Sequence, residues 1–225
     1  MDLARFFNVF LIMLLLSLFS TPACKLGTLG GSDGEVEEPE NLSLASLSSS
    51  QIAISWEDNS SNEDGFTVER AEDEGGAPGS WSVVAQVDAD IENYSDSGLN
   101  EARVYWYRVF ARSTELGDSK KAGPKSAETR LGEALNFEVL ELGDDSIEIS
   151  WSDNSDFEEG YIIERAEDQG DAPGTWTELV ELGEDTESHI DDTVSPNDTY
   201  WYRVYAFSSE YQDSNYTSHL FAGAN

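Results

Sequence analysis

Apolar and polar residues alternate along short stretches of the chain after residue 40. In residues 52–56, for instance, positions 52, 54 and 56 are apolar and small residues lie between them. An alternation with period two is typical of a β-strand that has one buried face. In the first half of the chain the pattern occurs, between Gly, Pro, Asn, Asp or Ser residues, in 42–47, 52–56, 66–70, 81–87 and 105–111. No stretch after residue 24 keeps helical spacing over three turns, so the sequence predicts an all-β antiparallel sandwich or barrel.

The whole pattern recurs at an interval of 95 residues. The equivalent residues include Trp56 and Trp151, Glu69 and Glu164, Trp81 and Trp176, Tyr105 and Tyr200, and Arg108 and Arg203. A repeat of this length is a domain with its own core, rather than a solenoid unit that needs neighbours. We therefore expect one domain at 41–130 and a second at 131–225.

Alternation also separates the expected core from the expected surface. Along residues 105–111 the odd-numbered side chains point inward, and along residues 66–69 the even-numbered ones do. Glu69 then faces Arg108 on a neighbouring strand as an opposite-charge pair, and Glu164 faces Arg203 in the second copy. Arg165 and Arg203 are the only Lys or Arg residues after residue 130, and each matches an arginine of the first half. This agreement indicates structural roles for both.

The charge of the chain is strongly negative, with a formal net charge of −34. Residues 131–225 contain 24 acidic and 2 basic residues, whereas residues 41–130 contain 16 and 8. Nucleic acids and anionic lipid headgroups both need Lys and Arg to replace their counterions. The composition therefore excludes nucleic-acid binding.

The first 23 residues are expected to be a secretory signal peptide. An apolar run at 6–20 follows Arg5, is too short to cross a membrane as a helix, and precedes small residues. Cys24, the only cysteine, comes directly afterwards, so no intramolecular disulfide can form. Residues 21–24 (TPAC) resemble the lipobox of bacterial lipoproteins, except that Thr21 stands where leucine is usual. The resemblance implies acylation at Cys24. Ordinary cleavage after Ala23, or an uncleaved anchor helix, remains an alternative.

Residues 24–40 are expected to form a flexible acidic tether. Gly, Ser and acidic residues dominate this stretch, and it has no apolar periodicity. Such a tether holds the first domain away from a bilayer.

The order of these residues resembles the fibronectin type III family. The resemblance rests on Trp56 in the second strand, on residues 65–69 (GFTVE), and on residues 105–111 (YWYRVFA). Residues 194–200 (VSPNDTY) resemble the family's tyrosine corner, in which the phenol hydroxyl reaches upstream backbone. In the first copy Glu101 stands where the proline is expected. The resemblance implies two tandem seven-stranded antiparallel β-sandwiches and no reaction.

Four tryptophans are the candidate binding surface: Trp81, Trp106, Trp176 and Trp201. Outward-facing tryptophans stack on sugar rings or anchor protein partners. Their presence at equivalent places in both copies favours a simpler interpretation, in which each covers its own sheet against Arg or Glu side chains or contacts the other domain.

Metal binding and catalysis have little support in the sequence. The acidic turns 57–64 and 153–159 offer oxygen ligands but lack the spacing of an EF-hand loop. His189 and His219 are isolated, and no nucleophile or phosphate-loop motif is present. We therefore expect no metal site, no cofactor and no enzyme activity.

These features together predict a non-enzymatic lipoprotein of a bacterial cell envelope, anchored to a membrane through Cys24. Its expected role is that of a protein-binding, adhesion or spacer module, with a carbohydrate-binding accessory module as the alternative. A secreted protein without an anchor is the alternative location.

Overall fold

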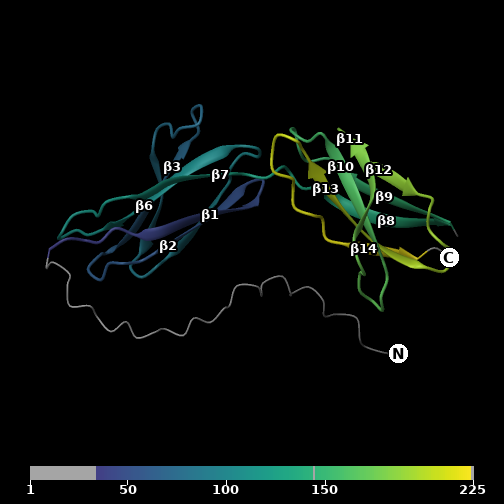
Figure 1. The fold of residues 1–225 in the computed structure, drawn as a ribbon, viewed down its shortest axis with the longest axis horizontal. Coiled ribbons are helices and arrows are strands. Elements are labelled where there is room, and N and C mark those ends of the chain that lie inside the picture. The colour runs from purple at the N-terminus through teal and green to yellow at the C-terminus, as the bar shows by residue number, and fades with distance from the viewer. Residues whose placement is uncertain (1–33, 144, 224–225) are drawn as a thin grey trace. The chain divides into compact units, whose positions relative to one another are not determined.

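A computed structural model describes residues 34–143 and 145–223 of the chain. The expected signal peptide, Cys24 and most of the expected tether lie outside the described residues. Among the described residues, no helix is long and apolar enough to span a membrane. The described chain is built from strands, as the alternation predicts (Figure 1).

The first sandwich contains seven antiparallel strands in two sheets. One sheet has the order β1-β2-β5 and the other has the order β4-β3-β6-β7. The strands are β1 (Glu40–Ser48), β2 (Gln51–Glu57), β3 (Gly65–Glu72), β4 (Ser82–Asp88), β5 (Asn93–Ser97), β6 (Val104–Arg112) and β7 (Ala122–Glu128).

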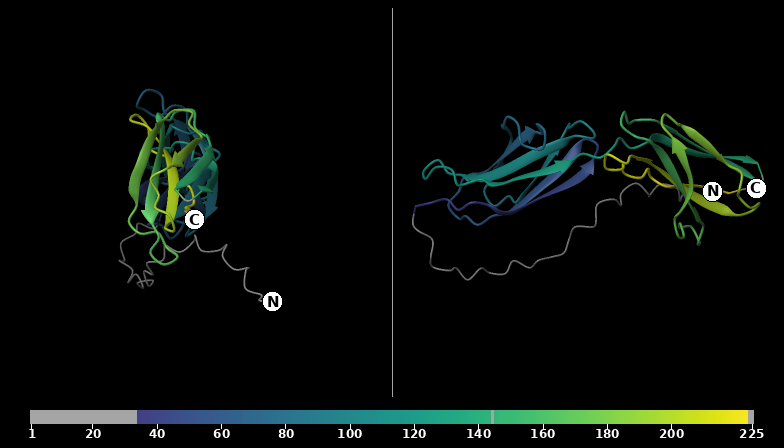
Figure 2. Two further views of the ribbon diagram at one scale, coloured as in Figure 1. Left: turned by 90° about the vertical axis from the view of Figure 1, so that its right-hand side faces the viewer. Right: turned by 45° about the horizontal axis from the view of Figure 1, so that its top comes forward.

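The second sandwich repeats this order strand by strand. Its strands run from green to yellow in Figure 2, and those of the first sandwich from purple to teal. Its sheets have the orders β12-β9-β8 and β11-β10-β13-β14. The strands are β8 (Leu135–Gly143), β9 (Ser146–Ser152), β10 (Gly160–Glu167), β11 (Thr177–Gly183), β12 (Ser188–Asp191), β13 (Thr199–Phe207) and β14 (Leu220–Gly223). The expected all-β class with two tandem sandwiches is confirmed.

Alternate side chains of the paired strands fill each core. Tyr107 on β6 and Tyr202 on β13 are fully buried, as the inward positions of their strands predict. Trp56 packs against Phe66 with ring centres 5.5 Å apart, and Trp151 packs against Tyr161 at 5.4 Å. Val36 also belongs to the first core, so the packed part of the chain begins before residue 41.

Both tyrosine corners form. The hydroxyl of Tyr105 accepts a hydrogen bond from the backbone N–H of Asn100 at 3.1 Å. The hydroxyl of Tyr200 accepts one from Ser195 at the same distance. Glu101 in place of proline therefore does not prevent the first corner from closing.

Candidate functional site

The outward side of sheet β4-β3-β6-β7, called the first outer face, is organised around Arg108. Nε of Arg108 donates to Oε2 of Glu69 at 2.5 Å, and its guanidinium lies 4.1 Å from the ring centre of Trp81. Lys121 reaches the same carboxylate at 2.8 Å and lies 4.8 Å from the ring centre of Phe110. The predicted pair of Glu69 and Arg108 is confirmed. Phe110 is only 8% exposed although it is on the outer side, because Lys121 lies over its ring.

The outward side of sheet β11-β10-β13-β14, called the second outer face, has the same central contacts. Nε of Arg203 donates to Glu164 at 2.6 Å, which confirms the second predicted pair. The guanidinium lies 4.3 Å from the ring centre of Trp176. It also lies 3.8 Å from the ring centre of Tyr216, which occupies the position of Lys121. Arg203 is thus enclosed between two rings.

Trp106 and Trp201 are held in place through their indole nitrogens. Nε1 of Trp106 donates to Asp73 at 2.7 Å, and Nε1 of Trp201 donates to Asp168 at 2.8 Å. The backbone N–H of Gly76 and then the indole of Trp106 hold the pKa of Asp73 below its usual value. The bond from Trp201 is the largest cause of the lowered pKa of Asp168.

The four candidate tryptophans are therefore half-buried, and each one contacts its own sandwich. Trp176 and Trp201 meet through His219, whose ring centre lies 6.1 Å and 5.3 Å from theirs. The interpretation in which each tryptophan covers its own sheet agrees with these contacts. Whether any of the four binds a ligand stays a prediction.

The sequence pattern did not predict a group of aromatic residues on the second outer face. Phe221 on β14 is 61% exposed and lies 4.9 Å from Trp201, ring centre to ring centre. Tyr216 is 44% exposed and packs edge-on against Tyr205 at 4.8 Å. A residue-by-residue comparison at the interval of 95 could have found them, because Lys121 and Ser126 occupy the equivalent positions.

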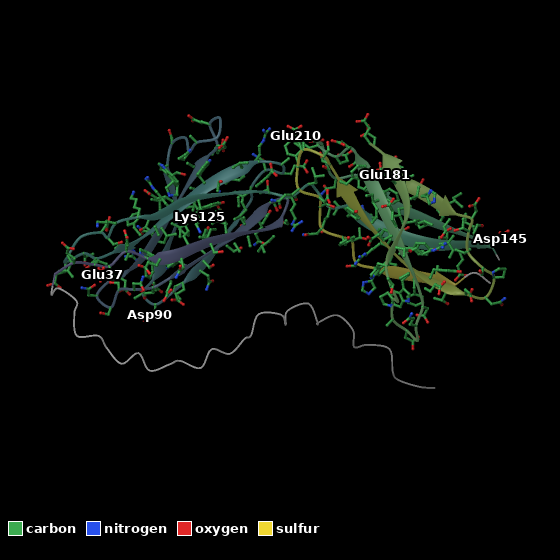
Figure 3. All side chains as sticks on the ribbon, viewed as in Figure 1. Glu37, Asp90, Lys125, Asp145, Glu181 and Glu210 are labelled. Carbon is green, nitrogen blue, oxygen red and sulfur yellow. The ribbon has the colours of Figure 1, made fainter. Side chains whose placement is uncertain are left out.

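The two outer faces also differ in charge. The three lysines after residue 25 all lie on or next to β7, at 120, 121 and 125, and Lys125 is labelled in Figure 3. Val83 and Gln86 on β4 become Glu178 and Glu181 on β11, of which Glu181 is labelled. The change from Lys121 to Tyr216, together with the two added carboxylates, makes the second outer face more negative than the first.

The buried carboxylates of both cores are engaged in ion pairs. Oδ2 of Asp96 accepts from Arg70 at 2.8 Å and from the Tyr107 hydroxyl at 2.9 Å. Oδ2 of Asp191 accepts from Arg165 at 2.7 Å and from the Tyr202 hydroxyl at 2.9 Å. The structural role predicted for Arg165 agrees with this pairing.

A second group of carboxylates could hold a metal ion. Asp58, Glu63 and Asp90 present carboxylate oxygens within 4.8 Å of one another, and so do the equivalent residues Asp153, Glu158 and Asp185. Carboxylate oxygens are ligands that Ca²⁺ accepts. Burial, together with the negative charges of Glu63, Asp90 and Glu92, raises the pKa of Asp58. Acidic groups of this kind are common without a metal, so the expectation of no metal site stays a prediction.

Glu101 connects the first sandwich to loops of the second. Its two carboxylate oxygens accept from the backbone N–H groups of Gly132 at 2.6 Å and of Asp156 at 2.9 Å. Leu131 is 1% exposed and packs in the second core. The residue that departs from the expected proline thus has a role of its own.

A comparison with family models agrees with the architecture of the first sandwich. The family model described as the fibronectin type III domain matches residues 37–124, which cover most of the first sandwich. A segment of two fibronectin type III domains from chicken tenascin is 14% identical, with a TM-score of 0.47, and the match covers 83% of this chain and 99% of that one. The FN1–FN3 domains of chicken CNTN1 are 18% identical, with a TM-score of 0.41 and coverage of 85% and 68%. No curated protein matches the chain.

Proposed function

We propose that this chain, whose first sandwich is a fibronectin type III domain and whose second repeats the same strand order, is a non-enzymatic protein-binding or adhesion module of a bacterial cell envelope. One observation carries the proposal. The two sandwiches keep the same core contacts, while their outer faces carry different side chains. A pure spacer needs no such difference between its faces.

The partners of two buried carboxylates argue against a catalytic role for these groups. The most deeply buried carboxylates, Asp96 and Asp191, each accept hydrogen bonds from an arginine and a tyrosine. A general base or nucleophile needs a carboxylate that is free to reach a substrate. Asp96 and Asp191 instead hold the two sheets of each sandwich together.

The proposed location rests on the segment that precedes the sandwiches. Cys24 follows the apolar run, and the stretch from residue 24 to residue 40 is rich in Gly, Ser and acids. Two or more acyl chains at Cys24 would hold the protein stably at a membrane. Mass spectrometry of the mature N-terminus tests this part: we expect a diacylated or triacylated Cys24. An unmodified N-terminus would remove the anchor.

Site-specific photo-crosslinking tests the binding function. A benzophenone amino acid is placed at Val83 on the first outer face or at Phe221 on the second, two exposed positions whose change leaves the cores intact. In cells that produce the protein, we expect a protein adduct from at least one position. A spacer yields no adduct at either position, and that outcome would contradict the proposal.

A further inference from the structure

We propose that the second outer face is a docking surface for a lysine- or arginine-rich segment of a protein partner. The inference rests on the proposed binding function and deepens it by naming a site and a ligand chemistry. It starts from the exposed rings of the face, Tyr216 and Phe221, and from their neighbours Trp201 and His219.

These rings form a continuous aromatic surface. Phe221 contacts Trp201, Trp201 contacts His219, and His219 contacts Trp176. Tyr216 extends the surface across the face of Arg203. Phe221 and Tyr216 leave 61% and 44% of their areas in solvent, so their rings are open to a partner.

The face already binds one cation in this way. The guanidinium of Arg203 lies between Trp176 and Tyr216, at 4.3 Å and 3.8 Å from the two ring centres. Cations within about 6 Å of an aromatic ring centre are attracted by the negative ring face. Glu164 balances the charge of Arg203, so this pair has no net charge that would repel a second cation at the exposed ring of Phe221.

Carboxylates around the rings add a negative field. Glu178 lies opposite Glu164 in the ladder and Glu181 lies opposite Ile162, so both side chains share the outer face. Burial, and then the charges of Tyr216, Asp213, Glu164 and Glu178, raise the pKa of Tyr205 to about 12. Burial is the largest of these causes, and the neighbouring carboxylates act on the pKa in the same direction.

The first outer face shows that the fold does not require these residues. It has the same strand order and the same Arg–Glu–Trp centre, but Val83, Gln86, Lys121 and Ser126 replace two carboxylates and two rings. The rings and carboxylates of the second face are therefore available for an interaction that the first face cannot make.

Charge complementarity selects the occupant. Residues 131–225 contain 24 acidic and 2 basic residues, so a basic segment is attracted. A second copy of a chain with net charge −34, or an anionic glycan, is repelled. A neutral sugar would stack on the rings but would gain no ionic attraction from Glu178 and Glu181.

Titration of the full chain with a fluorescent octalysine peptide tests the proposal. The peptide is attracted to any acidic protein, so matched variants locate the binding. We expect Phe221→Ser, which changes no charge, to weaken binding about fivefold at about 0.15 M salt, whereas Val83→Ser on the first outer face leaves it unchanged. Equal affinities of the two variants would show nonspecific attraction and overturn the proposal.

Two double variants that remove the same charge from different sandwiches give a second test of the site. Glu178→Gln with Glu181→Gln should weaken binding more than Asp88→Asn with Glu115→Gln, which removes the same charge from exposed positions of the first sandwich. Equal weakening would contradict the site. Cellohexaose is titrated in parallel, and sugar binding that Phe221→Ser abolishes, without an effect on octalysine, would assign the face to carbohydrate instead. If octalysine does not bind at the second outer face but a protein is crosslinked at Val83, the docking surface proposed here is wrong. The proposed protein-binding function would still stand.

Discussion

The two sandwiches of this chain use the same internal contacts and different surfaces. In both cores an arginine binds an aspartate of the opposite sheet and a tyrosine hydroxyl donates to the same carboxylate oxygen, with nearly equal distances. On the outer faces Lys121 and Ser126 of the first sandwich give way to Tyr216 and Phe221 of the second. The comparison separates the contacts that the fold requires from the surface side chains that can change while the fold stays the same. Contacts present in both sandwiches are structural, and contacts present in one are candidates for function.

Removal of the buried charge from the second core is expected to have the largest effect. Asp191→Asn weakens the ion pair with Arg165 and should lower the free energy of unfolding by about 3 kcal/mol. Asp96→Asn should cost about 1 kcal/mol less, because Thr193 gives Asp191 two further hydrogen bonds and Gly98 at the equivalent position has no hydroxyl. Urea unfolding of the full chain measures both. Equal losses would contradict the assigned role of Thr193.

The loss in Asp191→Asn also has a defined pH dependence. Burial acts to raise the pKa of Asp191, but the hydrogen bonds from Thr193, Arg165 and Tyr202 outweigh it and lower the pKa. A carboxyl group with a lowered pKa stabilises the folded protein at pH values above its pKa in the unfolded chain, which is about 3.9. This stabilisation is lost as the pH falls through the pKa of the group in the folded protein. The variant and the wild type should therefore converge in stability at strongly acidic pH.

Glu101 has no counterpart in the second sandwich, where Pro196 takes its place. Glu101→Ala removes a charged acceptor from two backbone N–H groups, those of Gly132 and Asp156, and should lower stability by about 2 kcal/mol. Pro196→Ala is the matched control and should cost less than about 1 kcal/mol. Thermal unfolding of the full chain compares the two. A larger loss in Pro196→Ala would show that the carboxylate contributes little to the junction.

The sequence predicted most strands and the core residues well, because the cores follow a simple periodicity of two. The alternation along residues 105–111 correctly placed Tyr105, Tyr107 and Val109 inward. It could not show that Phe110 is buried on the outer side, because the covering residue, Lys121, is brought there by the pairing of β6 with β7. Local pattern gives the direction of a side chain, and tertiary pairing decides what covers it.

The alternation of apolar and polar residues did not predict two of the strands or the aromatic surface, for related reasons. In β5 the inward position is occupied by the buried acid Asp96, and β7 contains Gly123 and Pro124, so neither reads as an apolar strand. Their pairing with β2 and β6 makes them strands. The change from Lys121 to Tyr216 is visible at the interval of 95, but the position of Tyr216 over Arg203 follows only from the folded chain.

The tyrosine corners give a prediction of intermediate size. Tyr105→Phe and Tyr200→Phe each remove one hydrogen bond to upstream backbone and should each cost about 1 kcal/mol. The loss should be slightly larger for Tyr105→Phe, because the ring of Pro196 fixes the backbone φ angle at its position in the second corner and Glu101 does not do so in the first. Urea midpoints of the two variants measure the difference. A corner that tolerates the change without loss would have no stabilising role.

The smallest expected effect is a gain in stability at the acidic triad of the first sandwich. The raised pKa of Asp58 means that the folded protein disfavours the charged carboxylate. This destabilisation is fully present above the pKa of Asp58 in the folded protein, and it disappears as the pH falls toward the pKa in the unfolded chain. Asp58→Asn should therefore stabilise the protein by about 0.5 kcal/mol at pH 7, a small gain because water screens this partly exposed group, and by nothing at pH 3.

Asp153→Asn is the matched change in the second sandwich and should give no gain. Asp153 accepts a hydrogen bond from the Tyr161 hydroxyl, which Phe66 cannot supply to Asp58 in the first sandwich. The negative charge on Asp153 therefore has a donor that the charge on Asp58 lacks, and its removal weakens that bond. Thermal unfolding of both variants at pH 7 and pH 3 measures the contrast. If both substitutions stabilise equally at pH 7, repulsion among the carboxylates governs the two triads alike, and the hydroxyl of Tyr161 makes no difference to the second.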